Sequence, residues 1–154
     1  MRGVLLTILI AVLVVVDQIS KWWTIEMFFR PRVLEAQGAS QNFWDWLVTY
    51  GQEQFPPARV EILEFFNFVM VWNKGVSFGM FSSTHDWMPL ILGGSALALC
   101  MVLAVWMVRA TYLSTLIPLA LIIAGALSNV WDRARFGAVA DFLDFHWGDM
   151  HYPA

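Results

Sequence analysis

Three long apolar stretches dominate the hydrophobic and polar pattern of this chain. They cover about residues 3–27, 87–108 and 112–131, and each is close to the roughly 20 residues that a helix needs to cross a bilayer. Arg109 ends the second stretch, and the few residues after it allow only a tight turn. The pattern therefore predicts three membrane helices. The last two form an antiparallel hairpin, and Pro118 is expected to kink the third.

The first apolar stretch also allows a second interpretation, a cleavable signal peptide. Arg2 precedes an apolar core, which is typical of such peptides. However, the segment Val14–Asp17 lacks the small residues of a cleavage site. We therefore expect the first stretch to remain as an uncleaved membrane helix.

Residues 30–86 separate the first two predicted helices. The first half, about 31–57, is rich in Gln, Gly and Pro and contains the amphipathic segment 42–47, which we expect on the bilayer surface. In the second half, 60–81, β-branched and aromatic residues alternate roughly, which predicts one or two strands with a turn at Asn73–Gly75. The predicted fold class is therefore an all-α polytopic membrane protein, one domain over 1–154, with a small β and amphipathic element.

Composition agrees with a membrane protein and excludes several other classes. The chain is 59% hydrophobic and 14% charged, against about 25% charge in soluble domains, and its nine Trp and 12 Phe suit membrane interfaces. The net charge of −3 without a basic run argues against nucleic acid as a partner. Cys100 alone cannot form an internal disulfide and is expected as a small buried side chain. His146 and His151 lack further ligands at suitable spacing, so no metal or other cofactor is expected.

Two groups of polar residues occur within or at the ends of the apolar stretches. Asp17 and Lys21 are four residues apart and share one helix face. Asn129 is three residues from Asp132 and four from Arg133, so these side chains can form one polar cluster. Ionisable residues in membrane helices often mark a functional site. For Asp17 and Lys21, the alternative is a structural pair whose Lys side chain extends to the membrane surface. For Asn129, Asp132 and Arg133, the alternative is a hydrogen-bond network that only stabilises the end of the helix.

Two further groups lie outside the predicted helices. Asn73 and Gly75 combine a turn-forming residue with a glycine that permits close approach of a ligand to the backbone. The alternative is an ordinary hairpin turn. Asp141 follows the third helix within the sequence Val-Ala-Asp-Phe. Taken alone, such a carboxylate can be a solvated charge at the membrane surface.

Together and in this order, the four groups resemble the conserved boxes of the lipoprotein signal peptidases, or signal peptidase II. The family boxes are Asp-Gln-x-x-Lys, Asn-x-Gly-x-x-Phe, Gly-Gly-x-x-Gly-Asn-x-x-Asp-Arg and Val-x-Asp-Phe, and they correspond to residues 17–21, 73–78, 124–133 and 139–142. Ala124 and Ser128 replace two glycines of the third box. Both are still small, so close helix packing is retained.

The resemblance implies a membrane-embedded aspartic endopeptidase that removes signal peptides from diacylglyceryl-modified bacterial prolipoproteins. Asp141 would be one of two catalytic aspartates. Two adjacent carboxylates cannot both ionise, so one accepts a proton from water while the protonated one polarises the scissile carbonyl. Asp132, beside Arg133, suits a bracing role better than proton transfer. The residues expected to bind substrate or brace the site are Asp17, Lys21, Asn73, Gly75, Asn129, Asp132 and Arg133.

The family pattern also implies a further segment with the second aspartate. It continues after His-Tyr-Pro-Ala with Phe-Asn-x-Ala-Asp and a fourth membrane helix, whereas this chain ends at Ala154. From the resemblance we expect the truncated form to be inactive or nearly so, although it could still bind signal peptides. Asp144 could replace the second aspartate only if residues 141–144 were helical, and we expect a strand there.

The family resemblance also sets expectations for location and partners. It implies a multi-pass protein of the bacterial inner membrane, with the N-terminus and the Arg109 turn in the cytoplasm and the 30–86 loop outside. The expected partners are lipid-modified prolipoprotein signal peptides and membrane lipid, with the protein itself a monomer. The competing hypothesis is a small non-enzymatic membrane protein, such as a transporter or assembly subunit. Transporters usually carry internal repeats or paired broken helices, and the sequence has neither.

Overall fold

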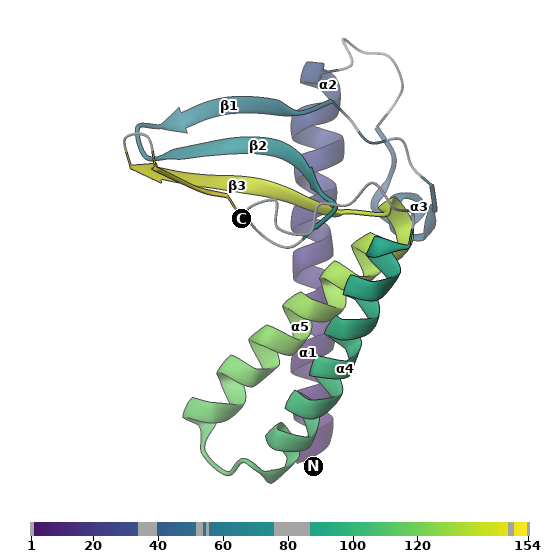
Figure 1. Ribbon diagram of the computed structural model, residues 1–154, viewed down its shortest axis with the longest axis vertical. Helices are drawn as coiled ribbons and strands as arrows, with labels where there is room; N and C mark the ends of the chain where they lie inside the picture. Colours follow the sequence, from purple (N-terminus) through teal and green to yellow (C-terminus); the bar gives the residue numbers. More distant parts are fainter. Residues whose placement is uncertain are drawn as a thin grey trace.

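The molecule has a helical part and a sheet that projects sideways from one end of it, as seen in the computed structural model (Figure 1). The structure describes residues 2–33, 40–51, 54, 56–75, 87–147 and 150–153. In chain order the elements are α1 Arg2–Trp22, the π-helix η1 Trp23–Phe29, α2 Arg30–Val33, α3 Phe43–Val48, β1 Ala58–Leu63, β2 Phe66–Asn73, α4 Met88–Arg109, α5 Leu113–Phe136, β3 Val139–Trp147 and β4 Met150–Pro153.

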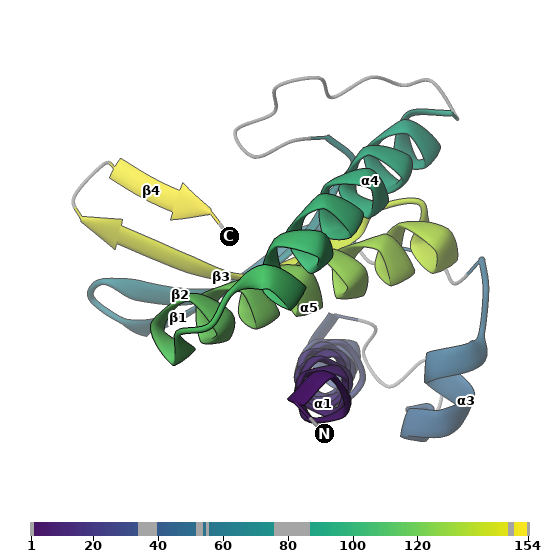
Figure 2. The ribbon, with the colours of Figure 1, turned by 90° about the horizontal axis from the view of Figure 1, so that it is seen from below.

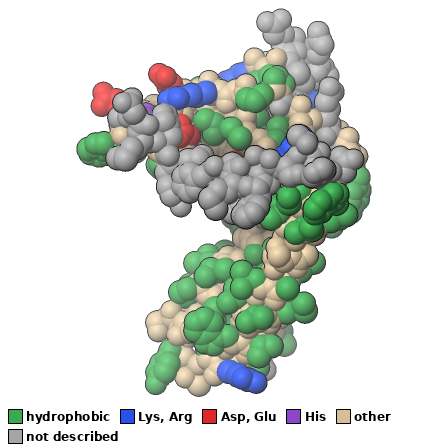
Figure 3. Space-filling model, viewed as in Figure 1, with side chains coloured by type: hydrophobic (Ala, Val, Ile, Leu, Met, Phe, Trp, Pro, Cys, Tyr) green, Lys and Arg blue, Asp and Glu red, His purple; other side chains and the backbone are tan. Residues whose placement is uncertain are grey.

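The prediction of three apolar helices of membrane-spanning length is confirmed for the described part of the chain. Three helices there are long and apolar enough to cross a membrane, covering residues 3–33, 88–109 and 113–136. Figure 3 shows the same division on the molecular surface, since the visible face of the helical part is mostly hydrophobic and charged side chains gather mainly around the sheet. The predicted hairpin of the last two helices is also confirmed, because α4 and α5 pack side by side (Figures 1 and 2).

Two of the predicted helix ends were wrong. The third helix continues past residue 131 to Phe136, where Gly137 adopts the left-handed conformation with φ of 69° and donates its N–H to the Arg133 carbonyl. A glycine at this position is a common helix stop, because it lacks the Cβ that disfavours this conformation. The Asn129–Arg133 group therefore lies inside the helix rather than at its end.

The first helix continues through a π-helical segment, η1, beyond the predicted end at residue 27. Glu26 within η1 is fully buried and binds the Arg30 guanidinium through two contacts of 2.6 and 2.8 Å. The same carboxylate accepts the backbone N–H of Gln41 at 2.9 Å. This ion pair compensates the cost of burying a carboxylate and attaches the chain before α3 to the end of the first helix.

In the helical part, α5 lies between α1 and α4 and contacts both (Figure 2). The core of this part contains Cys100, which is buried as predicted, and Met107 from α4. These side chains pack against one apolar face of α5, formed by Leu116, Leu119, Ala120 and Ile123. Because α1 and α4 both depend on α5, polar residues on α5 can reach partners on its neighbours.

The sheet is antiparallel with the strand order β1-β2-β3-β4. The turn between β1 and β2 lies at residues 64–65. The predicted turn at Asn73–Gly75 comes after β2, where the Gly75 N–H donates to Asn73 Oδ1 at 3.0 Å, and residues 76–86 lie outside the described ranges. The Asn73 side chain also binds a residue of β3, as described below. The register of the β2–β3 pairing shifts between Phe68, which is opposite Leu143, and Val71, which is opposite Asp141.

A second hydrophobic core joins the sheet, α3 and the ends of the long helices. Its buried members are Ile25, Phe29, Trp46, Met70, Phe136 and Ala140. The amphipathic segment 42–47 largely forms α3, and Asn42 caps it by accepting the N–H of Asp45 at 3.0 Å. Trp46 is buried while Trp44 on the other side is exposed, which is the asymmetry that an amphipathic helix requires.

Candidate functional site

The Lys21 ammonium on α1 is the centre of a buried polar cluster between α1 and α5. Its Nζ lies 2.6 Å from Asp132 Oδ2, 2.9 Å from Asp17 Oδ2 and 3.2 Å from Asn129 Oδ1. An ammonium group has three donors, so these acceptors satisfy all of them. Because Asp132 and Asn129 belong to α5, the interaction joins the two helices.

Gln18 and Ser128 complete this cluster. Gln18 Nε2 donates to Asp132 Oδ1 at 2.9 Å and to Ser128 Oγ at 2.7 Å, and the Ser128 hydroxyl donates to Asp17. Gln18, Ser128 and Asp132 are each buried. We call these residues the helix cluster: Asp17, Gln18, Lys21, Ser128, Asn129 and Asp132.

Asp141 lies in a second polar group, where β3 leaves the end of α5. Asn73 Nδ2 donates to Asp141 Oδ2 at 2.9 Å, and Asn73 Oδ1 accepts the N–H of Gly75 at 3.0 Å. In the sheet, Asn73 is directly opposite Val139, so Asp141 is its diagonal neighbour and within side-chain reach. The Asn73 amide is therefore fixed at both ends and presents its N–H to the carboxyl group.

Arg133 connects the two polar groups. Its Nη2 donates to the Gly75 carbonyl at 3.3 Å and its Nη1 to the Asn129 carbonyl at 3.4 Å. Its buried Nε has no hydrogen-bond partner within the described residues. We call Asn73, Gly75, Arg133 and Asp141 the junction site, because they meet where the helices join the sheet.

The environment of Asp141 favours its protonated form. Burial raises the pKa of this carboxyl from 3.8 to about 6. The hydrogen bond from Asn73 and the positive charges of Lys21 and Arg133 oppose this shift, whereas the negative charge of Asp132 adds to it. A pKa close to neutral is suited to general acid and base catalysis, because both protonation states are accessible.

The structure brings the predicted site residues into these two neighbouring groups and separates Asp144 from them. Residues 141–144 lie in strand β3, as predicted. Asp144 is buried and accepts from Asn67 Nδ2 at 2.8 Å, and the same Asn67 nitrogen lies 3.1 Å from His146 Nδ1. No group of three or more His, Cys, Asp or Glu suited to a metal occurs among the described residues.

Sequence reasoning did not identify Gln18, Ser128 or Arg135 as site residues. Ser128 was considered only as a small residue for helix packing, although it is four residues before Asp132 on the same helix face. Gln18 directly follows Asp17, but its position gives no indication that its amide is buried. Arg135 is 2% exposed, and nothing in its sequence position distinguishes it from a surface arginine.

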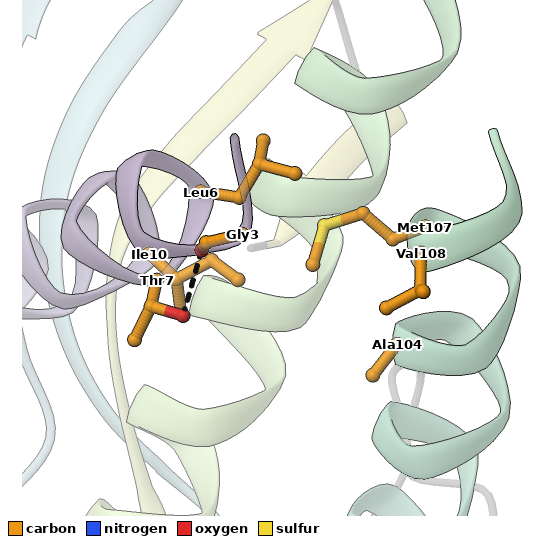
Figure 4. Close-up of a pocket in the computed structure, with 7 residues that line it drawn as sticks. All are labelled: Gly3, Leu6, Thr7, Ile10, Ala104, Met107 and Val108. Carbon is orange, nitrogen blue, oxygen red and sulfur yellow. Dashed lines mark hydrogen bonds between the residues drawn. The ribbon is translucent and has the colours of Figure 1, made fainter. Parts of the chain in front are cut away.

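A separate apolar cavity lies far from the junction site. It has a volume of about 470 Å³ and lies between the N-terminal part of α1 and the end of α4 (Figure 4). Leu6, Ile10 and Met107 are among its lining residues, and its one polar side chain, Thr7, is bonded to the carbonyl of Gly3 at 3.1 Å. The cavity contains none of the predicted site residues.

The raised pKa of Asp141 predicts a specific pH dependence of stability. The folded state binds the proton more tightly than the unfolded state, so this contribution is fully present below pH 3.8 and is lost as the pH rises through about 6. Asp141→Asn cannot ionise. In detergent, the unfolding temperature of the original chain should therefore fall relative to that of the variant between about pH 4 and pH 7. A difference that stays constant over this range would contradict the proposed environment of the carboxyl.

Comparison with known proteins identifies a family of similar proteins. The family model described as signal peptidase (SPase) II, Peptidase_A8, matches residues 9–154. The lipoprotein signal peptidase of Vibrio cholerae is 43% identical over 98 residues, which cover 62% of this chain and 57% of the relative. The enzyme of that name from Anaplasma phagocytophilum is 39% identical over 95 residues, covering 62% and 60%.

A third relative extends the match slightly. The lipoprotein signal peptidase of Sphingopyxis alaskensis is 40% identical over 108 residues, which cover 68% of this chain and 61% of the relative. The chain thus spans about 60% of the length of these curated relatives. The family match, in contrast, includes both the helix cluster and the junction site. The chain therefore belongs to the signal peptidase II family.

Proposed function

We propose that this chain carries the catalytic core of a membrane-embedded aspartic endopeptidase that removes signal peptides from diacylglyceryl-modified prolipoproteins. The observation that carries the proposal is the Asp141 carboxyl, which is held by Asn73 at 2.9 Å and has a pKa of about 6. Family membership supplies the reaction class. The relatives named above are lipoprotein signal peptidases, and this name supports the proposed substrate.

In the proposed mechanism, Asp141 acts with a second carboxylate from the family's Phe-Asn-x-Ala-Asp box. One carboxylate is ionised and accepts a proton from a water molecule, whose oxygen then attacks the scissile carbonyl. The other is protonated and donates a hydrogen bond to the carbonyl oxygen, where negative charge develops. The proton taken from water passes to the leaving amide nitrogen as the C–N bond breaks. A pKa of about 6 for Asp141 allows either role near neutral pH.

The other predicted residues would hold this carboxyl in place. Asn73 and Gly75 fix its orientation through the hydrogen bonds described above. Arg133 places a positive charge near Asp141 and binds the Gly75 carbonyl. Lys21 and its partners join α1 to α5 next to the junction site. These interactions resist separation of the two helices and so stabilise the position of the junction site.

The proposed substrate suits the surfaces of the helical part. Large apolar side chains are exposed along the outer faces of the helices, among them Leu5, Ile8, Val12, Leu90, Val102 and Ile122. Such faces are compatible with lipid and with the acyl chains and apolar helix of a lipid-modified signal peptide. We propose a monomeric multi-pass protein of the bacterial inner membrane that needs no metal or cofactor for this reaction.

Substitution of Asp141 tests the proposed mechanism. In a protein where the family's Phe-Asn-x-Ala-Asp box and last helix follow Ala154, Asp141→Asn should lower cleavage of a lipid-modified prolipoprotein at least about 100-fold, because the amide cannot exchange a proton with water. Protein yield and membrane insertion should be unchanged. Mass spectrometry of the substrate after incubation measures the loss of the signal peptide.

Asp132→Asn is the matched substitution in the helix cluster. Asp132 binds Lys21 at 2.6 Å and is fully buried. The substitution should therefore lower the yield of folded protein. The protein that does fold should still cleave the substrate. Cleavage by the Asp141→Asn protein at the original rate would refute the mechanism. Absence of cleavage by the unsubstituted protein would favour a non-enzymatic membrane protein.

Cysteine labelling tests the proposed orientation of the chain in the membrane. Tyr50 follows α3 and Tyr112 precedes α5, and these side chains are 60% and 75% exposed. In Figure 1, α3 and the turn between α4 and α5 lie at opposite ends of the helical part. In a Cys100→Ala background, an impermeant thiol reagent added to intact cells should label Tyr50→Cys but not Tyr112→Cys. The reverse pattern would invert the proposed topology.

A further inference from the structure

Arg135 is a buried cation that lies outside both polar groups defined above. It belongs to the last turn of α5 and is 2% exposed. Its guanidinium carbon lies 4.0 Å from the centre of the Trp46 ring and 4.4 Å from that of the Phe136 ring. Burial of a charge is costly unless other groups compensate it, and aromatic faces supply part of this compensation.

Gln18 is the hydrogen-bond acceptor of this guanidinium. Arg135 Nη1 lies 3.3 Å from Gln18 Oε1, whereas Nε and Nη2 have no hydrogen-bond partner within the described ranges. Among the described residues, the Arg135 guanidinium is thus in direct contact with two aromatic rings and one amide oxygen, and Asp132 and Tyr50 act on its charge from a greater distance. Removal of that oxygen would leave a buried cation without an acceptor there, which is strongly unfavourable.

The contact with Arg135 also sets the direction of the Gln18 amide. Oε1 points to the guanidinium, and Nε2 therefore points to Asp132 Oδ1 and Ser128 Oγ. A reversed amide would place its NH₂ against the guanidinium and its oxygen against the carboxylate, with both contacts repulsive. Arg135 and Asp132 therefore favour the same orientation of the Gln18 amide, in which Gln18 accepts from Arg135 and donates to Asp132.

On the other side, the same end of α5 holds α3 and the residues that follow it. Trp46 is fully buried against Arg135 and Phe136. The N–H of Gly51 donates to the Arg135 carbonyl at 3.0 Å, and Gln54 Nε2 donates to the Phe136 carbonyl at 2.7 Å. The position of α3 is thus linked to the last turn of α5 by side-chain and backbone contacts.

We propose that Arg135 is a positioning residue that links α3, through Trp46, to the hydrogen bonds of Asp132, through Gln18. With respect to activity this inference rests on the function proposed above. Strand β3, which carries Asp141, begins at Val139, directly after the Gly137–Ala138 connection. A displacement of the last turn of α5 is therefore transmitted to the junction site over a very short stretch of chain.

Hydrogen exchange measured by mass spectrometry tests the α3 contact in the 154-residue chain. Arg135→Met removes the guanidinium but keeps an apolar side chain, and exchange of residues 43–51 should become faster, on the order of tenfold. Arg135→Lys should not restore protection, because a lysine ammonium cannot stack flat on rings while donating to Gln18. Unchanged protection of this segment in Arg135→Met would overturn the proposal.

Arg32→Met is a matched control. The Arg32 guanidinium also lies 4.0 Å from a ring centre, that of Phe28, but this side chain is exposed and donates a hydrogen bond to the Phe28 backbone carbonyl. Exchange of residues 43–51 should be the same as in the original chain. If Arg135→Met does not accumulate, Trp46→Leu and Trp46→Phe test the same contact from α3, and only Trp46→Leu should lose protection.

Activity in the protein extended with the family's C-terminal box tests the link to Asp132. Arg135→Met and Gln18→Met should each lower kcat about tenfold with a smaller effect on KM, because the reacting carboxyl is displaced rather than the substrate released. The double variant should be no slower than the slower single variant, since both changes break one chain of contacts. Multiplicative losses, or a change in KM alone, would overturn the link.

The two measurements separate failure of this inference from failure of the proposed function. If the extended protein cleaves no lipid-modified prolipoprotein, the proposed function fails, and hydrogen exchange still decides the role of Arg135 in holding α3. If cleavage occurs and responds to Asp141→Asn but not to Arg135→Met, the function stands and the positioning role is refuted.

Discussion

The structure depends on the Lys21 ammonium and its three acceptors. A cation inside a membrane helix is costly unless it is paired, and here Asp17, Asn129 and Asp132 satisfy every donor within 3.2 Å. Since two of the acceptors lie on α5, the pairing also determines how α1 and α5 align. That alignment determines the position and direction of the C-terminal end of α5. It therefore also determines the position of β3 and of Asp141 within it.

The two polar groups therefore have different physical characters. In the helix cluster, charges and hydrogen-bonding groups are closely matched, which suits a rigid support. In the junction site, Asn73 is the side-chain donor to Asp141 among the described residues, and burial raises the pKa of Asp141 to about 6. A carboxyl with a perturbed pKa, held on a rigid support, is the arrangement expected at a functional site.

Much of this arrangement could be predicted from local sequence patterns. Apolar length predicted the three spans, and spacings of three and four residues predicted which polar side chains share a helix face. The turn at residues 64–65 was missed because Glu64 and Phe65 carry no local turn signal. Asn73 and Gly75 do have turn chemistry, but only the pairing of β2 with β3 shows that Asn73 also binds Asp141. Likewise, the roles of Gln18 and Arg135 arise from contacts between segments more than 100 residues apart, which no local pattern encodes.

The central claim, that the Lys21 pairing holds the helices in place, is tested most directly by a double-mutant cycle with Lys21→Met and Asp132→Leu. The measured quantity is the free energy of unfolding in detergent. Each single variant should lose about 3–5 kcal/mol, because it leaves a buried charge without its main partner. The double variant should recover much of this loss, since two apolar side chains then meet. Strictly additive losses would contradict the account.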